Sequence, residues 1–373
     1  MKKYSLNISP DFWKENPVSI GNLKVYLIWF DSMGAKSSCI LIKTPEIKIL
    51  VDPGVAAMQP GYPLPDEEKS KLRNTALECI KEASKEADTI FISHYHYDHH
   101  TLPREAGKIY EGKTLWIKNP NIWINQSQWK RARIFLEGLI GDKSQIIYTS
   151  NFSSFSIQNS LLNLPIAQGK NYGSYQKRKN EIIKKGKDWL KKLQEKWNQG
   201  PRVDEENLKK HKIFFADGKK FQAGATRVRF TLPLFHGMEY DRLGWVIGIV
   251  IERIKTKLIY TSDLQGPIIE DYARWIAKEK PSILLLDGPA TYLLGYMLNT
   301  INLQRCINNL LYILDNTSPK IFILDHHLLR DQRYRDRISR VYAHALRKGK
   351  KILTAAEWYK ETPLILKITG KMK

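Results

Sequence analysis

One short stretch dominates this sequence: Ser93-His94-Tyr95-His96-Tyr97-Asp98-His99-His100. It contains the pattern His-x-His-x-Asp-His, and the apolar residues just before it are typical of a buried strand. Alternate side chains of an extended segment point the same way, so His94 and His96 can reach one ion while the following turn carries Asp98 and His99 to another. Imidazole and carboxylate suit zinc, manganese or iron. A polar surface loop is the alternative, and so many ligands after one strand argue against it.

Composition predicts a folded chain with a large positive charge. The 373 residues allow one large domain or two ordinary ones, and 42% hydrophobic residues are enough for a real core. There are 60 Lys and Arg against 38 Asp and Glu, a net charge of +22. Such an excess favours an anionic substrate, with nucleic acid as one candidate partner. A lysine-rich surface selected for solubility or heat resistance is the competing explanation.

Cysteine usage and hydropathy indicate the compartment. The three cysteines stand far apart, at Cys39, Cys79 and Cys306. No disulfide framework is expected from them, and they fit a reducing, cytoplasmic setting. The apolar stretch 243–251 is too short to cross a bilayer, and the stretch 283–298 is interrupted by Asp287-Gly288-Pro289, so we expect no transmembrane segment. Nothing in the sequence indicates an oligomeric state.

Strands and helices are predicted to alternate along the chain. The predicted strands are 23–30, 37–43, 47–51, 88–92, 114–118, 213–216, 225–232, 243–251, 257–262, 282–286 and 320–324. The predicted helices are 66–87, 124–140, 267–278, 300–315, 330–347 and 355–360. The first three strands predict a β-meander, and 243–251 with 257–262 predict an antiparallel pair. This order is typical of a layered α/β domain.

Residues 168–212 differ in composition from the rest. Between Lys170 and Lys212, 14 Lys and Arg stand against 6 Asp and Glu. One helical stripe is apolar, through Ile182, Gly186, Trp189, Leu190, Leu193 and Trp197, and the other face carries Lys184, Lys185, Lys187, Lys191, Lys192 and Lys196. This pattern predicts an amphipathic basic helix that ends at Gly200-Pro201. It can dock on the core with a solvated lysine face, follow a nucleic-acid backbone, or lie on an anionic membrane.

Further ligand types follow other strand ends. Asp52 follows the strand at 47–51, His236 lies just past 225–232, and Asp263 follows Tyr260-Thr261-Ser262. His326 and His327 follow 320–324. Each alone is more often a turn or surface group. Strand ends on one side of a layered sandwich converge on one edge, so together with the histidine stretch they predict a two-metal pocket.

This ordered series resembles the metallo-β-lactamase superfamily from about Leu23 to Arg330, with the basic segment as the least matched part. The matched residues are Asp52, His94, His96, Asp98, His99, His236, Asp263 and, for the last histidine, His326 with His327 as second choice. Segments 260–267, 287–289 and 325–331 are similar to one family of predicted hydrolases in this superfamily. The resemblance implies a four-layer αββα sandwich of the α/β (α+β) class. It implies one domain over 1–373 with a basic helical insertion at about 150–212.

The resemblance also implies a ligand set for two divalent metal ions. One ion takes His94, His96 and His236; the other takes Asp98, His99 and His326, and Asp263 bridges them. Zinc is the expected metal, with manganese and iron as alternatives. Asp52 then orients a ligand histidine through its second ring nitrogen. The candidate catalytic residues are Asp98 and, as general acid, His327, with His100 behind it; a structural role for these two histidines is the stronger alternative.

The implied activity is hydrolysis by a metal-bridging hydroxide. The full ligand set and the positive charge favour a phosphodiesterase or a nuclease. The alternative is a hydrolase of a small anionic metabolite, such as a lactone, thioester or phosphate ester, with Tyr292 and Tyr296 walling the pocket. A nucleic-acid-binding protein with a structural metal is a third hypothesis, although structural zinc sites are usually closed four-ligand sites rich in cysteine.

Overall fold

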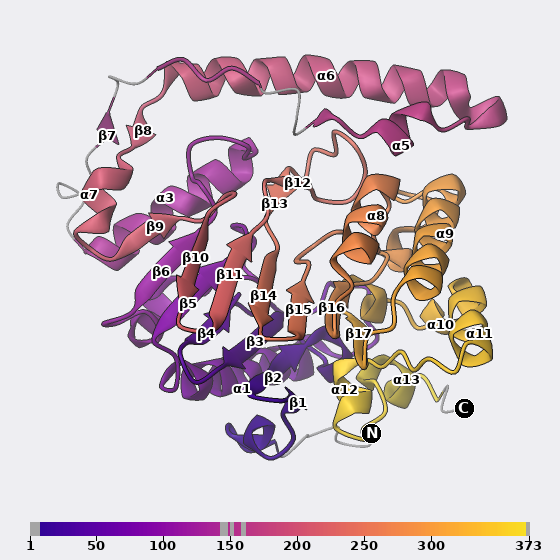
Figure 1. The fold of residues 1–373 in the computed structure, drawn as a ribbon, viewed down its shortest axis with the longest axis horizontal. Coiled ribbons are helices and arrows are strands. Elements are labelled where there is room, and N and C mark those ends of the chain that lie inside the picture. The colour runs from indigo at the N-terminus through magenta and orange to yellow at the C-terminus, as the bar shows by residue number, and fades with distance from the viewer. Residues whose placement is uncertain (1–7, 142–147, 150–152, 158–161, 371–373) are drawn as a thin grey trace.

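The computed structural model describes residues 8–141, 148–149, 153–157 and 162–370. Two β-sheets form its centre, and helices cover their outer faces (Figure 1). The division into one domain with an insertion at about 150–212 stays a prediction, and residues 150–152 and 158–161 within it lie outside the described part. None of the helices in that part combines the length and apolar character needed to cross a membrane.

The first sheet has the order β1-β2-β3-β4-β5-β6-β9. Its strands are β1 Val18–Ile20, β2 Leu23–Phe30, β3 Ser38–Lys43, β4 Lys48–Val51, β5 Thr89–Ile92, β6 Thr114–Ile117 and β9 Ile213–Phe215. The strands from β1 to β4 pair antiparallel, and those from β4 to β9 pair parallel. This arrangement confirms the predicted meander and the strand that precedes the histidine stretch.

The second sheet has the order β10-β11-β14-β15-β16-β17. Its strands are β10 Lys220–Ala223, β11 Thr226–Phe230, β14 Ile249–Arg253, β15 Thr256–Tyr260, β16 Ile283–Asp287 and β17 Ile321–Asp325. Pairing is antiparallel from β10 to β15 and parallel from β15 to β17. Two short pairs complete the strands: β7 Tyr148–Thr149 with β8 Arg202–Val203, and β12 Leu234–Phe235 with β13 Trp245–Val246.

Helices lie between and beyond the strands. They are α1 Asp66–Ser84, α2 Pro103–Ala106, α3 Gln126–Ile140, α5 Pro165–Gly169, α6 Gln176–Gln199, α7 Glu205–Lys209, α8 Glu270–Glu279, α9 Thr300–Asn316, α10 Tyr334–Arg337, α11 Ser339–Arg347, α12 Ala355–Trp358 and α13 Leu364–Ile368. Short 3-10 turns include η2 Asp31–Met33, η6 Thr291–Leu293 and η7 His326–Arg330.

The period of two along each strand explains the layers. In β3, Ile40 and Ile42 belong to the core between the sheets, whereas Leu41 belongs to the core that includes Ile80 of α1. In β16, Ile283 and Leu285 likewise face the inner core and the alternate residues face the helix side. Alternate side chains of a strand point to opposite faces, so both faces of each sheet are buried. The predicted αββα sandwich is confirmed.

Two predicted elements are wrong in detail. The strand expected over 243–251 is divided, because β13 pairs with β12 whereas β14 joins the second sheet. Gly248 lies at the division, and a Cβ atom there would stand 2.9 Å from the backbone oxygen of Tyr260. The helix expected over 330–347 is broken into η7, α10 and α11, because Arg333 and Ile338 leave helical geometry.

Candidate metal centre

The histidine stretch forms a tight loop at the end of β5. The backbone N–H of His99 donates to the backbone oxygen of His96 at 2.9 Å, and the N–H of Ser93 donates to Asp52 Oδ1 at 2.7 Å. The segment after β4 runs directly against this loop: a Cβ atom at Gly54 would lie 2.1 Å from the nitrogen of His100. Only glycine fits there, so the chain of β4 holds the loop of β5 in place.

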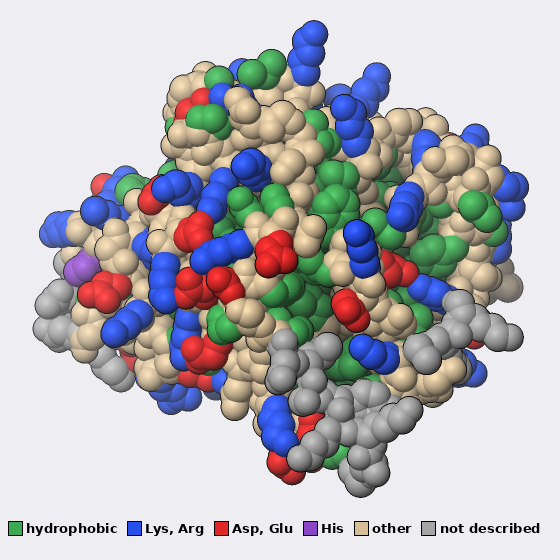
Figure 2. Space-filling model, turned by 90° about the horizontal axis from the view of Figure 1, so that it is seen from below, with side chains coloured by type: hydrophobic (Ala, Val, Ile, Leu, Met, Phe, Trp, Pro, Cys, Tyr) green, Lys and Arg blue, Asp and Glu red, His purple; other side chains and the backbone are tan. Residues whose placement is uncertain are grey.

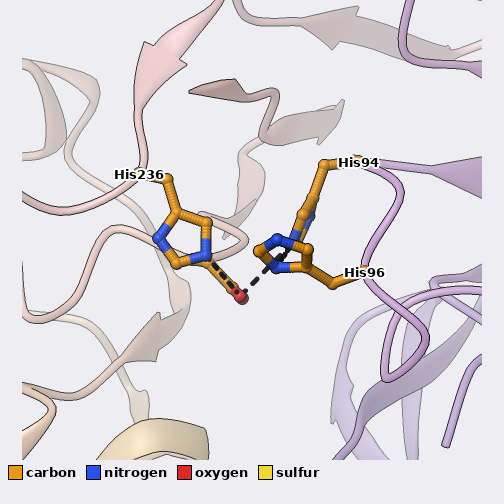
Figure 3. Close-up of side chains that lie close together, drawn as sticks. His94, His96 and His236 are labelled. Carbon is orange, nitrogen blue, oxygen red and sulfur yellow. Dashed lines mark hydrogen bonds and ion pairs between the residues drawn. The ribbon is translucent and has the colours of Figure 1, made fainter. Parts of the chain in front are cut away.

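The predicted ligands converge from four segments. Their nitrogen and oxygen atoms form two groups, one of His94, His96, His236 and Asp263 and one of Asp98, His99 and His326, with the atoms of each group within 4.8 Å of one another. Asp263 and His326 also form a third such group with His327. Figure 3 shows the rings of His94, His96 and His236 turned toward a common point. These contacts join the loop after β5, the loop after β12, and the ends of β15 and β17.

Asp263 stands between the two groups, with one oxygen toward each. Oδ2 lies 3.4 Å from His94 Nε2 and 3.1 Å from His236 Nε2. Oδ1 lies 3.1 Å from His99 Nε2 and 3.4 Å from His326 Nε2. This two-sided arrangement is the geometry expected of a carboxylate that bridges two ions.

Several of these atoms are buried without a hydrogen-bond partner. They are His99 Nε2, His236 Nε2 and both carboxylate oxygens of Asp263. The atoms stand close together but are not aimed at one another as donor and acceptor. Buried polar atoms normally have a partner, and a cation between the two groups would supply it. The donor set of imidazole and carboxylate therefore fits zinc, manganese or iron.

The second ring nitrogen of most ligands is held by a fixed partner. His99 Nδ1 donates to Asp52 Oδ2 at 2.9 Å, and His326 Nδ1 donates to Asp31 Oδ1 at 2.9 Å. Asp52 also accepts from the hydroxyls of Ser93 and Tyr260, at 2.6 and 2.7 Å. Such outer contacts fix the rings of His99 and His326 so that Nε2 faces Asp263, where an ion would bind.

The charges of the cluster are strongly coupled. Burial opposes ionisation of Asp263, but His99, His326 and His94 outweigh it and hold the pKa of this carboxyl well below its usual range. Burial opposes protonation of His99, yet Asp263 and Asp52 raise its pKa to about 10. Burial lowers the pKa of His94 to about 4. Ions that bind here must therefore displace protons, which makes metal affinity rise with pH.

Two site residues were missed by the sequence reasoning. Arg330 is buried, donates to Asp31 Oδ2 at 2.5 Å through Nε, and donates to Asp98 Oδ2 at 3.1 Å through Nη2. Asp31 thus orients His326 and also pairs with an arginine that contacts Asp98. Asp31 directly follows β2, so the strand-end rule applied to Asp52 would have found it. Arg330 had no comparable signal.

The neighbouring histidines have different surroundings. His327 Nδ1 lies 3.0 Å from both oxygens of Asp287, and its Nε2 lies 4.0 Å from Asp263 Oδ2. Burial, Arg330 and His326 hold the pKa of His327 well below its usual range. His100 donates to the backbone oxygen of His96 and packs on Tyr95 and Phe135. The structure does not bring His100 into the cluster.

The backbone is strained where the site is built. Asp52, Ser262 and His326 have φ angles of 48°, 54° and 67°. Residues other than glycine rarely adopt this left-handed region, which costs of order 1–3 kcal/mol each. Each of these residues follows the end of a strand. Such strain clusters at functional sites, where packing over-determines the conformation.

Comparisons with known proteins identify sequence relatives of this chain. Residues 34–159 match the family described as beta-lactamase superfamily domain. The chain is 33% identical over 331 residues to a UPF0282 protein of Methanopyrus kandleri, covering 86% of this chain and 89% of that one. It is 32% identical to a UPF0282 protein of Korarchaeum cryptofilum, covering 88% and 86%.

Solved structures show a more distant similarity. Unliganded yeast PDE1 is 11% identical with a TM-score of 0.42, covering 90% of this chain and 98% of that one. A metallo hydrolase of the archaeon Ignicoccus hospitalis is 11% identical with a TM-score of 0.35, covering 88% and 94%. These scores are low, so the family assignment depends on the sequence relatives.

Proposed function

Because this chain belongs to the UPF0282 family and is a metal-dependent hydrolase with a beta-lactamase superfamily domain, we propose that it cleaves phosphodiesters, with nucleic acid as the substrate class. The observation that carries the proposal is the two-sided placement of Asp263 between two groups of buried ligands. The net charge of +22 favours an anionic polymer over an uncharged substrate.

Each ion has a set of residues that would hold it. His94, His96 and His236 would hold one, Asp98, His99 and His326 would hold the other, and Asp263 would contact both. Two such ions, when bound, supply Lewis acidity that activates water near neutral pH and stabilises the oxygens of the transition state. Zinc is the metal that we expect, with manganese and iron as alternatives.

The surrounding residues orient the ligands and handle protons. Asp52 and Asp31 hold His99 and His326 with Nε2 turned inward. Hydrolysis adds hydroxide to phosphorus and a proton to the departing ester oxygen. His327 lies at the rim of the first group, on Asp287, and we assign it the transfer of that proton. Because its low pKa keeps the ring neutral, His327 first takes the proton from the attacking water and then gives it to the ester oxygen.

A second candidate is a hydrolase of a small anionic metabolite. One observation favours it: the side chains of His94, His99, His236 and Asp263 are at most 1% exposed, so only a small part of a substrate can reach them. The hydroxyl of Tyr292 lies 3.4 Å from Nη1 of Arg330, whose Nη2 contacts Asp98, whereas Tyr296 is 85% exposed. Salt separates the two candidates, because an enzyme that neutralises several phosphates loses affinity steeply as salt rises.

The first experiment measures metal content and hydrolysis on the same sample. Protein purified without added metal is analysed for its elements, then tested on bis-p-nitrophenyl phosphate and labelled single-stranded RNA and DNA. We expect two equivalents of metal and phosphodiester cleavage. We expect Asp263→Asn to lower turnover by at least about a hundredfold. Substitution of a residue that only hydrogen-bonds to a metal ligand already lowers activity by about 10- to 100-fold, and Asp263 is a proposed ligand itself.

Matched substitutions outside the cluster separate chemistry from folding. Asp315→Asn and His344→Ala alter a surface pair with a contact of 2.8 Å, and both should keep full turnover. His94→Ala should lose turnover, while its circular dichroism spectrum should remain the same as that of the parent. Cleavage by Asp263→Asn at the parental rate would refute the metal-dependent mechanism. Two equivalents of metal without phosphodiester cleavage would instead favour the small-metabolite hydrolase.

A further inference from the structure

The basic helix α6 is docked on the segment that carries His236. Trp189 stacks on Trp245 with ring centroids 5.6 Å apart and planes 2° apart. A Cβ atom at Gly186 would lie 2.3 Å from that of Tyr240, so the helix approaches this loop as closely as a glycine allows. Lys179 pairs with Glu239, three residues after His236, at 2.5 Å. The helix therefore lies over the edge of the sandwich at which the metal ligands gather (Figure 1).

The opposite side of α6 is a row of unneutralised lysines. We define the lysine face as the six exposed side chains Lys184, Lys185, Lys187, Lys191, Lys192 and Lys196. None of the six forms an ion pair with any residue that the structure describes, although Asp188 and Glu195 lie on the same helix. At a rise of 1.5 Å per residue the face is about 18 Å long, enough to meet several phosphates of one strand.

The far side of the molecule is different in character. Figure 2, seen from below, shows Lys and Arg side chains intermingled with Asp and Glu. On that face the positive side chains have acidic neighbours, whereas the six lysines of the lysine face lie together on one helix and form no ion pair with the described residues.

A groove runs beside the lysine face. Its volume is about 590 Å³, and its lining includes Lys187 and Lys191 together with Leu190, Asn163 and Tyr240. Tyr240 belongs to the loop that follows His236. Lysines beside an aromatic side chain are a combination that can hold unpaired nucleotides, because phosphates pair with the lysines and a base can stack on the ring.

The docking of α6 argues against a membrane as the partner. A helix on a bilayer surface buries its apolar face in lipid. Here Gly186, Leu190, Leu193 and Trp197 are buried against the protein, so that face is not available.

We propose that the lysine face and its groove bind single-stranded nucleic acid and lead it to the metal centre. This inference rests on the proposed function for the identity of the substrate, and it adds the surface that recognises it. The lysines contact the phosphate backbone and not the bases, so the affinity for nucleic acid should depend weakly on base sequence and strongly on salt concentration.

The test measures binding without catalysis. Full-length protein in EDTA is titrated into fluorescein-labelled single-stranded RNA and DNA of about 20 nucleotides, and anisotropy is read between about 50 and about 200 mM salt. The quadruple variant K184Q/K187Q/K191Q/K192Q should bind more than about tenfold more weakly than the parent, with a salt slope smaller by about 3.

A control variant removes the same charge elsewhere. The variant K24Q/K48Q/K255Q/K320Q replaces four exposed lysines at or just before the first residues of their strands, whereas the candidate ligands follow the last residues of strands. Lys24 and Lys48 both pair with Lys43, so they lie together at the end of the first sheet that is opposite to the site. Its affinity should stay within about twofold of the parent, since only net charge changes. Melting temperatures of both variants establish that they are folded.

The outcomes separate this inference from the proposed function. Equal loss of affinity in both variants, or no binding by the parent at about 50 mM salt, would overturn the inference. Binding of phosphatidylserine vesicles that depends on the lysine face, without binding of nucleic acid, would overturn it as well. If the parent protein binds RNA through the lysine face but cleaves no phosphodiester, the inference about the binding surface stands and the proposed phosphodiesterase activity is refuted.

Discussion

At the scale of the residue, two adjacent histidines illustrate how position selects a role. His326 Nε2 faces Asp263 Oδ1, the oxygen that also faces His99, and lies 3.9 Å from Asp98 Oδ2. His327 Nε2 faces the other oxygen of Asp263 and is held by Asp287. His326 thus completes the group that contains Asp98, whereas His327 borders the group that already has three histidines. We therefore assign the ligand role to His326.

This assignment predicts different losses for the two substitutions. His326→Asn should bind one equivalent of metal in place of two, because its group retains only Asp98 and His99 beside Asp263. His327→Asn should keep both equivalents and lose turnover, more with alkyl phosphodiesters than with p-nitrophenyl esters, since p-nitrophenolate leaves without a proton. Elemental analysis and rates with both ester types check this. The reverse pattern of metal loss would make His327 the ligand.

At the scale of the element, α6 is joined to the body of the protein by a buried ionic network. Glu239 Oε2 pairs with Lys179 of α6 and lies 3.1 Å from Arg305 Nη1 of α9, and Arg305 also pairs with Glu270 of α8. Burial opposes ionisation of Glu239, but Arg305 and Lys179 outweigh it and lower its pKa to about 2. The network ties the basic helix to the loop after His236.

The lowered pKa predicts an acid-sensitive attachment. A carboxyl with a depressed folded pKa stabilises the fold fully above its ordinary value of 4.5, and this contribution is lost as the pH falls from there toward about 2. Glu239→Gln should cost about 3–5 kcal/mol at pH 7, because it leaves buried cations without their partner. Urea unfolding, followed by tryptophan fluorescence, should show this difference shrinking below pH 4.5.

An exposed carboxyl serves as the control for this prediction. Glu67 pairs with Lys71 on the surface of α1 at 2.9 Å, and Glu67→Gln should unfold like the parent at pH 7. A cost for Glu239→Gln that stays constant from pH 7 to pH 3 would contradict the assigned titration.

At the scale of the whole molecule, the candidate metal centre joins both sheets. Its proposed ligands come from the ends of β5, β15 and β17 and from the loop after β12, so ions bound there would cross-link elements that are far apart in the sequence. Binding to the folded state alone stabilises it by about 2.7 kcal/mol when free metal is one hundred times the dissociation constant.

Metal removal should therefore lower the stability of the entire protein. We expect EDTA to reduce the melting temperature by several degrees and zinc to restore it, with the parent and the lysine-face variant behaving alike. Asp263→Asn should respond less, because the carboxylate common to both ligand groups is gone. Differential scanning calorimetry at pH 7 measures this. A melting temperature of the parent that is independent of metal would argue against a centre that bridges the sheets.

The sequence by itself determined the layers and the family, and it supplied the candidate ligands that the structure brings together. Strands with a period of two and the His-x-His-x-Asp-His pattern are local signals, since a few neighbouring residues produce them. The basic helix was also predicted from its stripe, and its end at Gly200 was correct. Local patterns also identified Asp52, which the structure places on His99.

Only the tertiary structure decided which distant residues meet. Asp31 and Arg330 are 299 positions apart, and no local spacing signals their contact. The division of 243–251 between two sheets depends on the backbone of Tyr260 beside Gly248. The order of His326 and His327 around Asp263 depends on the left-handed backbone at His326. Periodicity specifies the face on which a side chain lies, whereas packing of remote segments specifies the atoms that it contacts.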